Sequence, residues 1–93
     1  MDGQVTVVTV VHAPACHLCD DAVEALGRVA ARFPLRVDVV EIESTEGRRL
    51  VAEHRPAMNP LVLVDGARFS AGRLPRRKLE RLLAGRTRPV GAR

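Results

Sequence analysis

Stretches of apolar residues with different periods follow one another along the chain and predict its order of strands and helices. The run Val5–Val11 is β-branched throughout, which predicts a strand buried on both faces. From Cys16 to about Arg32 the apolar spacing becomes helical. The apolar residues of this stretch share one predicted face: Ala22, Val23, Leu26, Val29, Ala30 and Phe33. Pro34 ends the helix, because the residue before a proline disfavours helical geometry.

The middle of the chain predicts a second strand followed by a short helix. Leu35–Glu43 alternates apolar and charged residues over much of its length, which is typical of a strand less buried than the first. Ser44 or Thr45 can cap a helix that runs to about His54. Two residues of this helix are expected to face the core, namely Leu50 and Val51.

A β-hairpin is predicted where two short apolar stretches, Leu61–Val64 and Ala67–Ser70, flank Asp65-Gly66. This dipeptide readily adopts the positive φ angles of a tight hairpin turn. A last helix is expected from about Pro75 to about Gly85. Its inner face is predicted to consist of Leu79, Leu82 and Leu83. The predicted order is therefore β-α-β-α-β-β-α.

The length and composition of the chain are those of one globular domain. The chain has 93 residues, 46% of them hydrophobic, and only two phenylalanines as aromatic residues, so we expect a single aliphatic core. No repeat or linker divides the sequence. We therefore assign residues 1–85 to one domain and residues 86–93 to a basic tail.

The location of the protein is predicted from what the first apolar run lacks. No basic segment precedes Val5–Val11, and no small-residue cleavage site follows it, so the run is interpreted as a core strand and not as a signal peptide. No apolar run approaches the length of about 18 residues that a membrane span needs. We expect a cytoplasmic protein, in a compartment where thiols are kept reduced.

Charge is distributed unevenly along the chain. The net charge of the whole is +4, but residues 1–65 carry 6 basic and 10 acidic groups (net −4), while residues 66–93 carry 9 basic groups and one acidic group (net +8). A basic end can attract acidic partners. Nucleic acid is not the expected partner, because no aromatic residues lie between these charges to stack on bases.

The two cysteines of the chain, Cys16 and Cys19, lie where the first predicted strand leads into the first helix. The N-terminus of a helix stabilises an anion through its unpaired N–H groups and its dipole. There the pKa of a thiol can fall to about 3.5–7.5. This placement predicts a nucleophilic thiolate at Cys16, with a second thiol one turn away to resolve a mixed disulfide.

The histidines and carboxylates near the pair are assigned different roles. His17, when cationic, would stabilise the Cys16 thiolate and lower the pKa of Cys16 further. Asp20 and Asp21 are expected mainly to stabilise the start of the helix. His12 is expected to pack or to cap the loop. Two further residues are given structural roles: Met58 as core filling near Pro60, and His54 as an exposed helix end.

The Cys-x-x-Cys at the start of a helix, the element order, Pro60 directly before the hairpin and Gly72 after it resemble the thioredoxin fold. Without a further strand and helix at its N-terminus, the chain resembles glutaredoxins and small bacterial glutaredoxin-like proteins, over about residues 4–84. This resemblance implies a three-layer α/β sandwich with a four-stranded mixed sheet. It also implies that Cys16 attacks and Cys19 resolves.

The resemblance gives the remaining site residues their expected roles. Pro60 would be cis and lie beside the cysteine pair, and the backbone of Asn59 would pair with an extended substrate. His17, Asn59, Pro60 and Gly72 together form the expected substrate-binding set. The sequence departs from glutaredoxins in the pair between the cysteines. It also lacks, after Gly72, the Gly and Asp that glutaredoxins use to bind glutathione.

Three classes of function are compatible with these residues. The first is a monomeric dithiol oxidoreductase acting on disulfides of proteins or of low-molecular-weight thiols, supplied with electrons by a reductase or a small thiol and holding no permanent cofactor. The second is a zinc or iron–sulfur protein whose ligands would come from Cys16, Cys19, His12 and His17, with His54 as a more distant candidate. The third is a non-catalytic binding module that uses the basic C-terminal end. The spacing and context of the cysteines favour the first.

Overall fold

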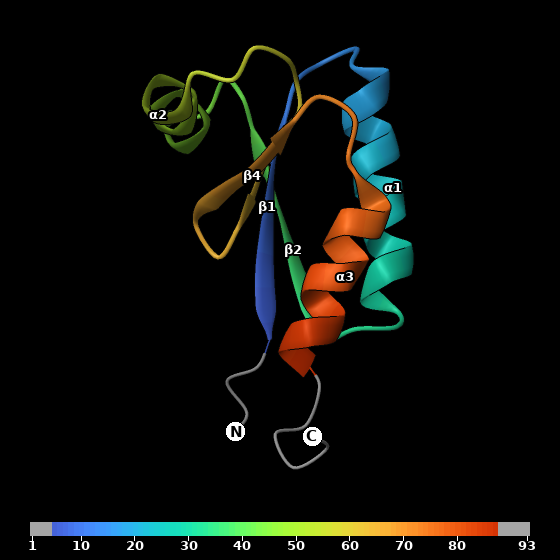
Figure 1. The fold of residues 1–93 in the computed structure, drawn as a ribbon. Helices are drawn as coiled ribbons and strands as arrows, with labels where there is room; N and C mark the ends of the chain where they lie inside the picture. The colour runs from blue at the N-terminus through green and yellow to red at the C-terminus, as the bar shows by residue number, and fades with distance from the viewer. Residues whose placement is uncertain (1–4, 88–93) are drawn as a thin grey trace.

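The structure, a computed structural model, describes residues 5–87. Its elements follow the predicted order (Figure 1). They are β1 (Thr6–His12), α1 (His17–Ala30), β2 (Leu35–Glu41), α2 (Thr45–His54), β3 (Leu61–Val64), β4 (Ala67–Ala71) and α3 (Arg76–Thr87). In the part of the chain that is described, no helix is both long and apolar enough to cross a membrane.

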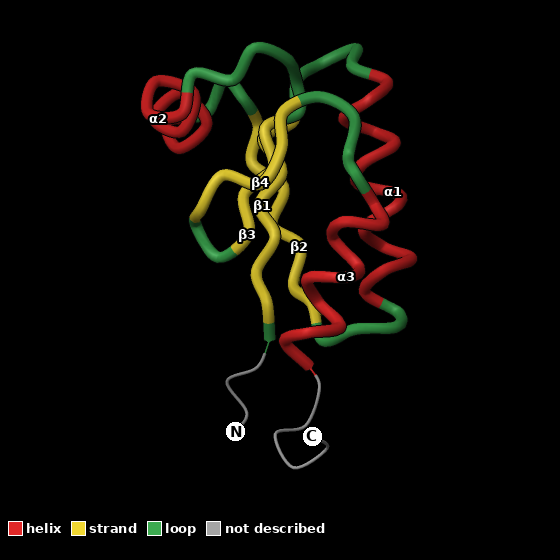
Figure 2. The backbone as a smooth tube through the Cα atoms, in the orientation of Figure 1, coloured by secondary structure: helices red, strands yellow, loops and turns green. Residues whose placement is uncertain are grey.

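The four strands form one mixed sheet in the order β2-β1-β3-β4. The central strand β1 runs parallel to β2 and antiparallel to β3, and β3 and β4 form the predicted antiparallel hairpin. Figure 2 shows α1 and α3 on one face of this sheet and α2 on the other. The chain is thus an α/β sandwich of three layers, as expected.

The larger part of the core lies between the sheet and the pair α1 and α3. Its buried residues come from four elements: Val8, Val10, Leu26, Val29, Val62, Val64, Leu79 and Leu83. Most of them, including Leu26, Leu79 and Leu83, have no accessible surface. Burial of large aliphatic side chains on this scale is the main force that holds the two helices on the sheet.

A smaller core lies beneath α2 on the opposite face. Leu50 of α2 packs there against Val11, Leu61 and Leu63, with Ile42 and Val51 at the margin. The residues of β1 and β3 alternate between this cluster and the larger one, as the period of a strand requires. β1 is therefore buried on the face toward α1 and α3, whereas on the face toward α2 Val11 is buried and Val7 and Thr9 are half-buried.

Some apolar residues of the predicted elements are exposed. Val5, predicted to begin the strand buried on both faces, precedes β1 and is 54% exposed. Ala30, expected on the inner face of α1, is exposed, and Ala25 is buried instead. The reason is that the inward face of α1 is centred on Ala22, Leu26 and Val29, and Ala30 lies on its solvent side. Val39 of β2 is 46% exposed because β2 is an edge strand.

The end of α3 differs from the expectation. The sequence predicts that the helix ends near Gly85, but it continues to Thr87. Arg86, assigned from the sequence to a tail, instead donates to Thr6 Oγ1 at 3.3 Å and pairs with the Asp65 carboxylate. These contacts stabilise the last turn against the low helix propensity of Gly85. The rest of the predicted tail, residues 88–93, lies outside the described residues.

Candidate functional site

The turn between β1 and α1 presents Cys16 at the start of the helix. Pro14 and Ala15 form the turn, and Ala15 has a φ of 53°, in the left-handed region that favours glycine. Cys16 is the N-cap of α1, with extended backbone angles. Its Sγ accepts the backbone N–H of Cys19 at 3.1 Å. The Cys16 sulfur therefore occupies the place of a capping oxygen, toward which an unpaired helix N–H points.

Cys16 and Cys19 form a disulfide, with Cα atoms 5.2 Å apart. The two sulfurs have different surroundings. Cys16 is half-buried, whereas Cys19 has no accessible surface and its Sγ accepts the backbone N–H of Ala13 at 3.5 Å. An incoming thiol or disulfide can therefore reach the first cysteine more readily than the second.

A second loop reaches the same end of the sheet. Val11 of β1 pairs with Leu61 of β3, so the residue before Leu61, Pro60, lies level with the end of β1. The Asn59–Pro60 peptide bond is cis, and Pro60 is buried. The Pro60 carbonyl accepts the N–H of Gly72 at 3.0 Å. Pro60, Asn59 and Gly72 are thus brought together next to the strand that leads to the cysteines.

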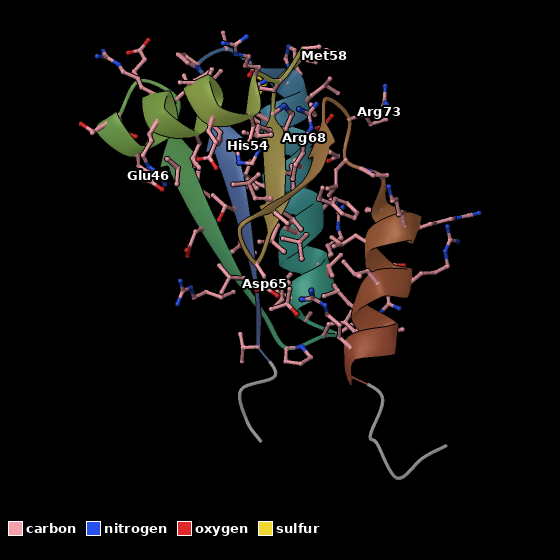
Figure 3. All side chains as sticks on the ribbon, turned by 60° about the vertical axis from the view of Figure 1, so that its left-hand side comes forward. Glu46, His54, Met58, Asp65, Arg68 and Arg73 are labelled. Carbon is pink, nitrogen blue, oxygen red and sulfur yellow. A yellow bond between two sulfur atoms is a disulfide. The ribbon has the colours of Figure 1, made fainter. Side chains whose placement is uncertain are left out.

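Met58 lies on the surface of this loop and does not fill the core as expected. Its side chain is 56% exposed. It lies over Gly72, where an added Cβ would meet its Sδ at 3.4 Å. Figure 3 shows Met58 and Arg73 at one end of the molecule and Asp65 toward the other. Met58 lies in the connection between α2 and β3, where its side chain faces solvent and not the core.

A groove of about 310 Å³ runs from the cysteine motif along the seam between α1 and the start of α3. Leu18, from between the cysteines, lines it together with Arg73, Leu74 and Arg76. Neither arginine has an ion-pair partner among residues 5–87. His17, the other residue between the cysteines, is exposed, and its side chain makes no hydrogen bond or ion pair within the same range.

His12 has partners that the sequence did not reveal. Its Nε2 lies 2.9 Å from Asp20 Oδ1, and its Nδ1 lies 3.4 Å from Glu41 Oε1. The hydrogen bond to Asp20 is the largest cause of a pKa of His12 above its ordinary value. Partial burial opposes this rise, and the hydrogen bond and charge of Glu41 add to it. The prediction that His12 packs or caps the loop missed this bridge between α1 and β2. An acidic residue early in α1 and another at the end of β2 were the available signal.

The candidate metal ligands do not form a common site. No group of three or more His, Cys, Asp and Glu side chains within residues 5–87 is arranged to hold a metal ion. The distant candidate, His54, is expected from the sequence to be exposed, but its side chain is only 15% exposed. It lies at the C-terminal end of α2, where its carbonyl accepts Arg68 Nη1 at 2.8 Å (Figure 3). The Arg68 side chain covers this end of the helix.

Comparison with known proteins assigns the fold. No protein-family model matches the chain, and no curated protein matches it either. Among solved structures, the chain is similar to a mutant thioredoxin from Halobacterium salinarum NRC-1. The TM-score is 0.65 at 18% identity, over 91% of this chain and 77% of that one. The chain therefore has the thioredoxin-like α/β fold.

Proposed function

We propose that the protein is a small glutaredoxin-like thiol–disulfide oxidoreductase that uses the dithiol of Cys16 and Cys19. The observation that supports this most is the pair itself. The sulfur of Cys16, a half-buried residue, caps helix α1, and it is bonded to the sulfur of Cys19, which has no accessible surface. In the reduced protein, the cap would stabilise a thiolate on Cys16 and keep the pKa of this thiol below the free value of about 8.5.

The proposed reaction transfers two electrons from the dithiol to a disulfide. The Cys16 thiolate attacks one sulfur of the substrate, forming a mixed disulfide and releasing the other sulfur as a thiolate that takes a proton from solvent. Cys19 then loses its proton to solvent and attacks the Cys16 sulfur, which releases the second substrate thiolate. The protein is left with the Cys16–Cys19 disulfide. A reductase, or two molecules of a small thiol, returns it to the dithiol.

The loop before β3 is the proposed substrate-binding element. Asn59, Pro60 and Gly72 are close together there, and the backbone of Asn59 is proposed to pair with an extended substrate segment. His17 is exposed between the cysteines, where its charge can act on the thiolate and on the substrate. The substrates we propose are disulfides of proteins or of low-molecular-weight thiols, acted on in the cytoplasm by a monomer without a permanent cofactor.

The experiment that tests this function compares two cysteine variants. Cys19→Ser leaves the attacking thiol without its resolving partner, so it is expected to accumulate a mixed disulfide when mixed with a disulfide substrate, detectable by mass spectrometry. Cys16→Ser keeps one thiol but removes the nucleophile, so turnover in a disulfide-reduction assay is expected to fall to the uncatalysed rate. Full turnover by Cys16→Ser would contradict the proposal.

The pH dependence of alkylation gives a second test. In Cys19→Ser, the rate of reaction of Cys16 with iodoacetamide follows its thiolate fraction. A midpoint below about 8.5 is expected for a capping thiolate. A midpoint at or above this value would contradict an activated Cys16.

A further inference from the structure

We propose that His12 is a positioning residue for the dithiol: as an imidazolium bridging Asp20 and Glu41, it fixes the first turn of α1 to the sheet and compensates the carboxylate that directly follows Cys19. The proposal rests on the proposed function. It assigns a task to a side chain that is neither a cysteine nor part of the substrate-binding loop.

The charge of His12 follows first from geometry. Each ring nitrogen faces a carboxylate oxygen, Nε2 at 2.9 Å from Asp20 and Nδ1 at 3.4 Å from Glu41. A carboxylate only accepts hydrogen bonds, and a neutral imidazole has one N–H. Both contacts can be hydrogen bonds only when both nitrogens carry protons. The bridge is therefore complete only in the imidazolium form.

The bridge joins three elements that meet at the cysteines. His12 is the last residue of β1, Asp20 belongs to the first turn of α1, and Glu41 is the last residue of β2. The Asp20 N–H donates to the Cys16 carbonyl at 3.1 Å. The residue after His12, Ala13, donates its N–H to Cys19 Sγ. A change at His12 is thus transmitted to both cysteines through one backbone contact each.

The electrostatic consequence concerns Asp20. An unpaired carboxylate beside the cysteines would destabilise a thiolate and raise the pKa of the Cys16 thiol. The positive charge of His12, 2.9 Å from Asp20, opposes that effect. Asp20 from α1 and Glu41 from β2 are the charged groups in contact with His12 within residues 5–87. The charge state of His12 therefore helps to set how much thiolate Cys16 carries.

The first experiment needs no change at the site. The C2–H proton resonances of the three histidines are followed by NMR across pH and assigned with the variants His17→Gln and His54→Gln. The His12 resonance is expected to titrate above the ordinary histidine midpoint of about 6.5. In Glu41→Gln, which removes one carboxylate and keeps the other, its midpoint is expected to fall. A wild-type midpoint at or below about 6.5 would overturn the proposal.

The second experiment measures the pKa of Cys16 in a double-mutant cycle. His12→Gln, Asp20→Asn and the double variant are each made in the Cys19→Ser background, so that one thiol titrates. His12→Gln is expected to raise the Cys16 pKa by about 0.5 unit, the size of a surface charge interaction. In the Asp20→Asn background the same change should have little effect. His54→Gln, a histidine substitution on α2, is the control and should leave the Cys16 pKa unchanged.

The readings separate the possible outcomes. If His12 has only a structural role, His12→Gln will lower the free energy of unfolding and leave the pKa of Cys16 unchanged. That result would overturn the proposal. The proposal would also be overturned if His12→Gln raised the pKa of Cys16 by the same amount in the Asp20→Asn background. The cycle needs only that Cys16 titrates, not that it turns over substrate. If the wild-type protein shows no disulfide reductase activity, the proposed function is rejected, but the role of His12 is still tested by the pKa of Cys16.

Discussion

Gly47 shows how a single residue is constrained by a neighbouring element. It lies in the first turn of α2 and donates its N–H to Ser44 Oγ at 3.0 Å. A Cβ at this position would overlap the Glu41 carbonyl oxygen and lie 2.8 Å from Ile42 Cα. Backbone atoms cannot move aside as the end of a flexible side chain can. Glycine is therefore required at position 47 for a steric reason, although glycine weakens a helix.

Gly47→Ala is predicted to lower the free energy of unfolding by about 1–3 kcal/mol, the usual penalty for overpacking. The measurement is urea denaturation. Gly27→Ala is the matched control, because Gly27 lies in α1 with no atom within 4 Å of an added Cβ. That variant should raise stability by about 1 kcal/mol through helix propensity. Equal effects of the two substitutions would contradict the steric explanation.

The raised pKa of His12 leads to a further prediction at the scale of one residue, which concerns the pH dependence of stability. Because folding raises this pKa, the folded protein binds the proton more tightly than the unfolded chain does. The stabilisation is fully present below the unfolded pKa of about 6.5, provided that Asp20 and Glu41 stay ionised, and is lost as the pH rises through the folded value. Urea denaturation of wild type and His12→Gln should show a difference that shrinks with rising pH. A stability difference between wild type and His12→Gln that grows with pH would contradict this prediction.

At the scale of elements, the hairpin turn links the two ends of the described chain. Asp65 Oδ1 accepts the N–H of Val7 at 2.9 Å, and Oδ2 pairs with Arg86 of α3. The Val7 N–H is the main cause, and Arg86 a further one, of a lowered pKa of Asp65. The turn therefore fastens the start of β1 and the last turn of α3 through one carboxylate.

Asp65→Asn is predicted to lower the free energy of unfolding by about 1 kcal/mol, because the amide is uncharged and pairs weakly with Arg86. The wild-type advantage should be present above the ordinary pKa of an aspartate, about 3.9, and should disappear as the pH falls through the lowered folded pKa. Thermal unfolding across pH measures this. Asp38→Asn, which removes an exposed pair with Arg36 on β2, is the control and should change stability by less than about 0.5 kcal/mol. A larger loss at Asp38 would contradict the special role of the turn.

At the scale of the whole molecule, the two faces of the sheet carry cores of unequal size. Leu83 of α3 has no accessible surface and belongs to the larger cluster, to which α1 and all four strands contribute directly or at its margin. Leu50 of α2 belongs to the smaller cluster and keeps 5% exposure. More elements surround Leu83 than surround Leu50. We therefore expect the residues around Leu83 to move less to fill a cavity left by its removal.

Leu83→Ala is predicted to destabilise the protein more than Leu50→Ala, within the range of about 2–5 kcal/mol for a buried leucine. Both variants remove the same atoms, so the difference reports how far each site relaxes. Urea denaturation of the pair provides the measurement. A greater loss for Leu50→Ala would indicate that α2 is the more tightly packed helix.

The sequence by itself determined the features that depend on near neighbours. The periods of apolar residues predicted every strand and helix, Asp65-Gly66 predicted the hairpin turn, and the positions of Cys16 and Cys19 predicted a pair at the start of a helix. Each of these follows from spacing along a few consecutive residues, because helix and strand geometry repeat over short distances.

Only the tertiary structure decided which distant residues meet. His12 lies between Asp20 and Glu41, Arg86 pairs with Asp65, and Met58 in the loop before β3 is exposed. The acidic residues early in α1 and at the end of β2 are visible in the sequence, but they do not identify the partner of His12, because a charged side chain in a helix or strand has many possible partners until the sheet order and the helix positions are set. The sheet places the ends of β1 and β2 side by side and packs α1 across them. That placement, and not the spacing of residues, brings two carboxylates to one histidine beside the cysteines.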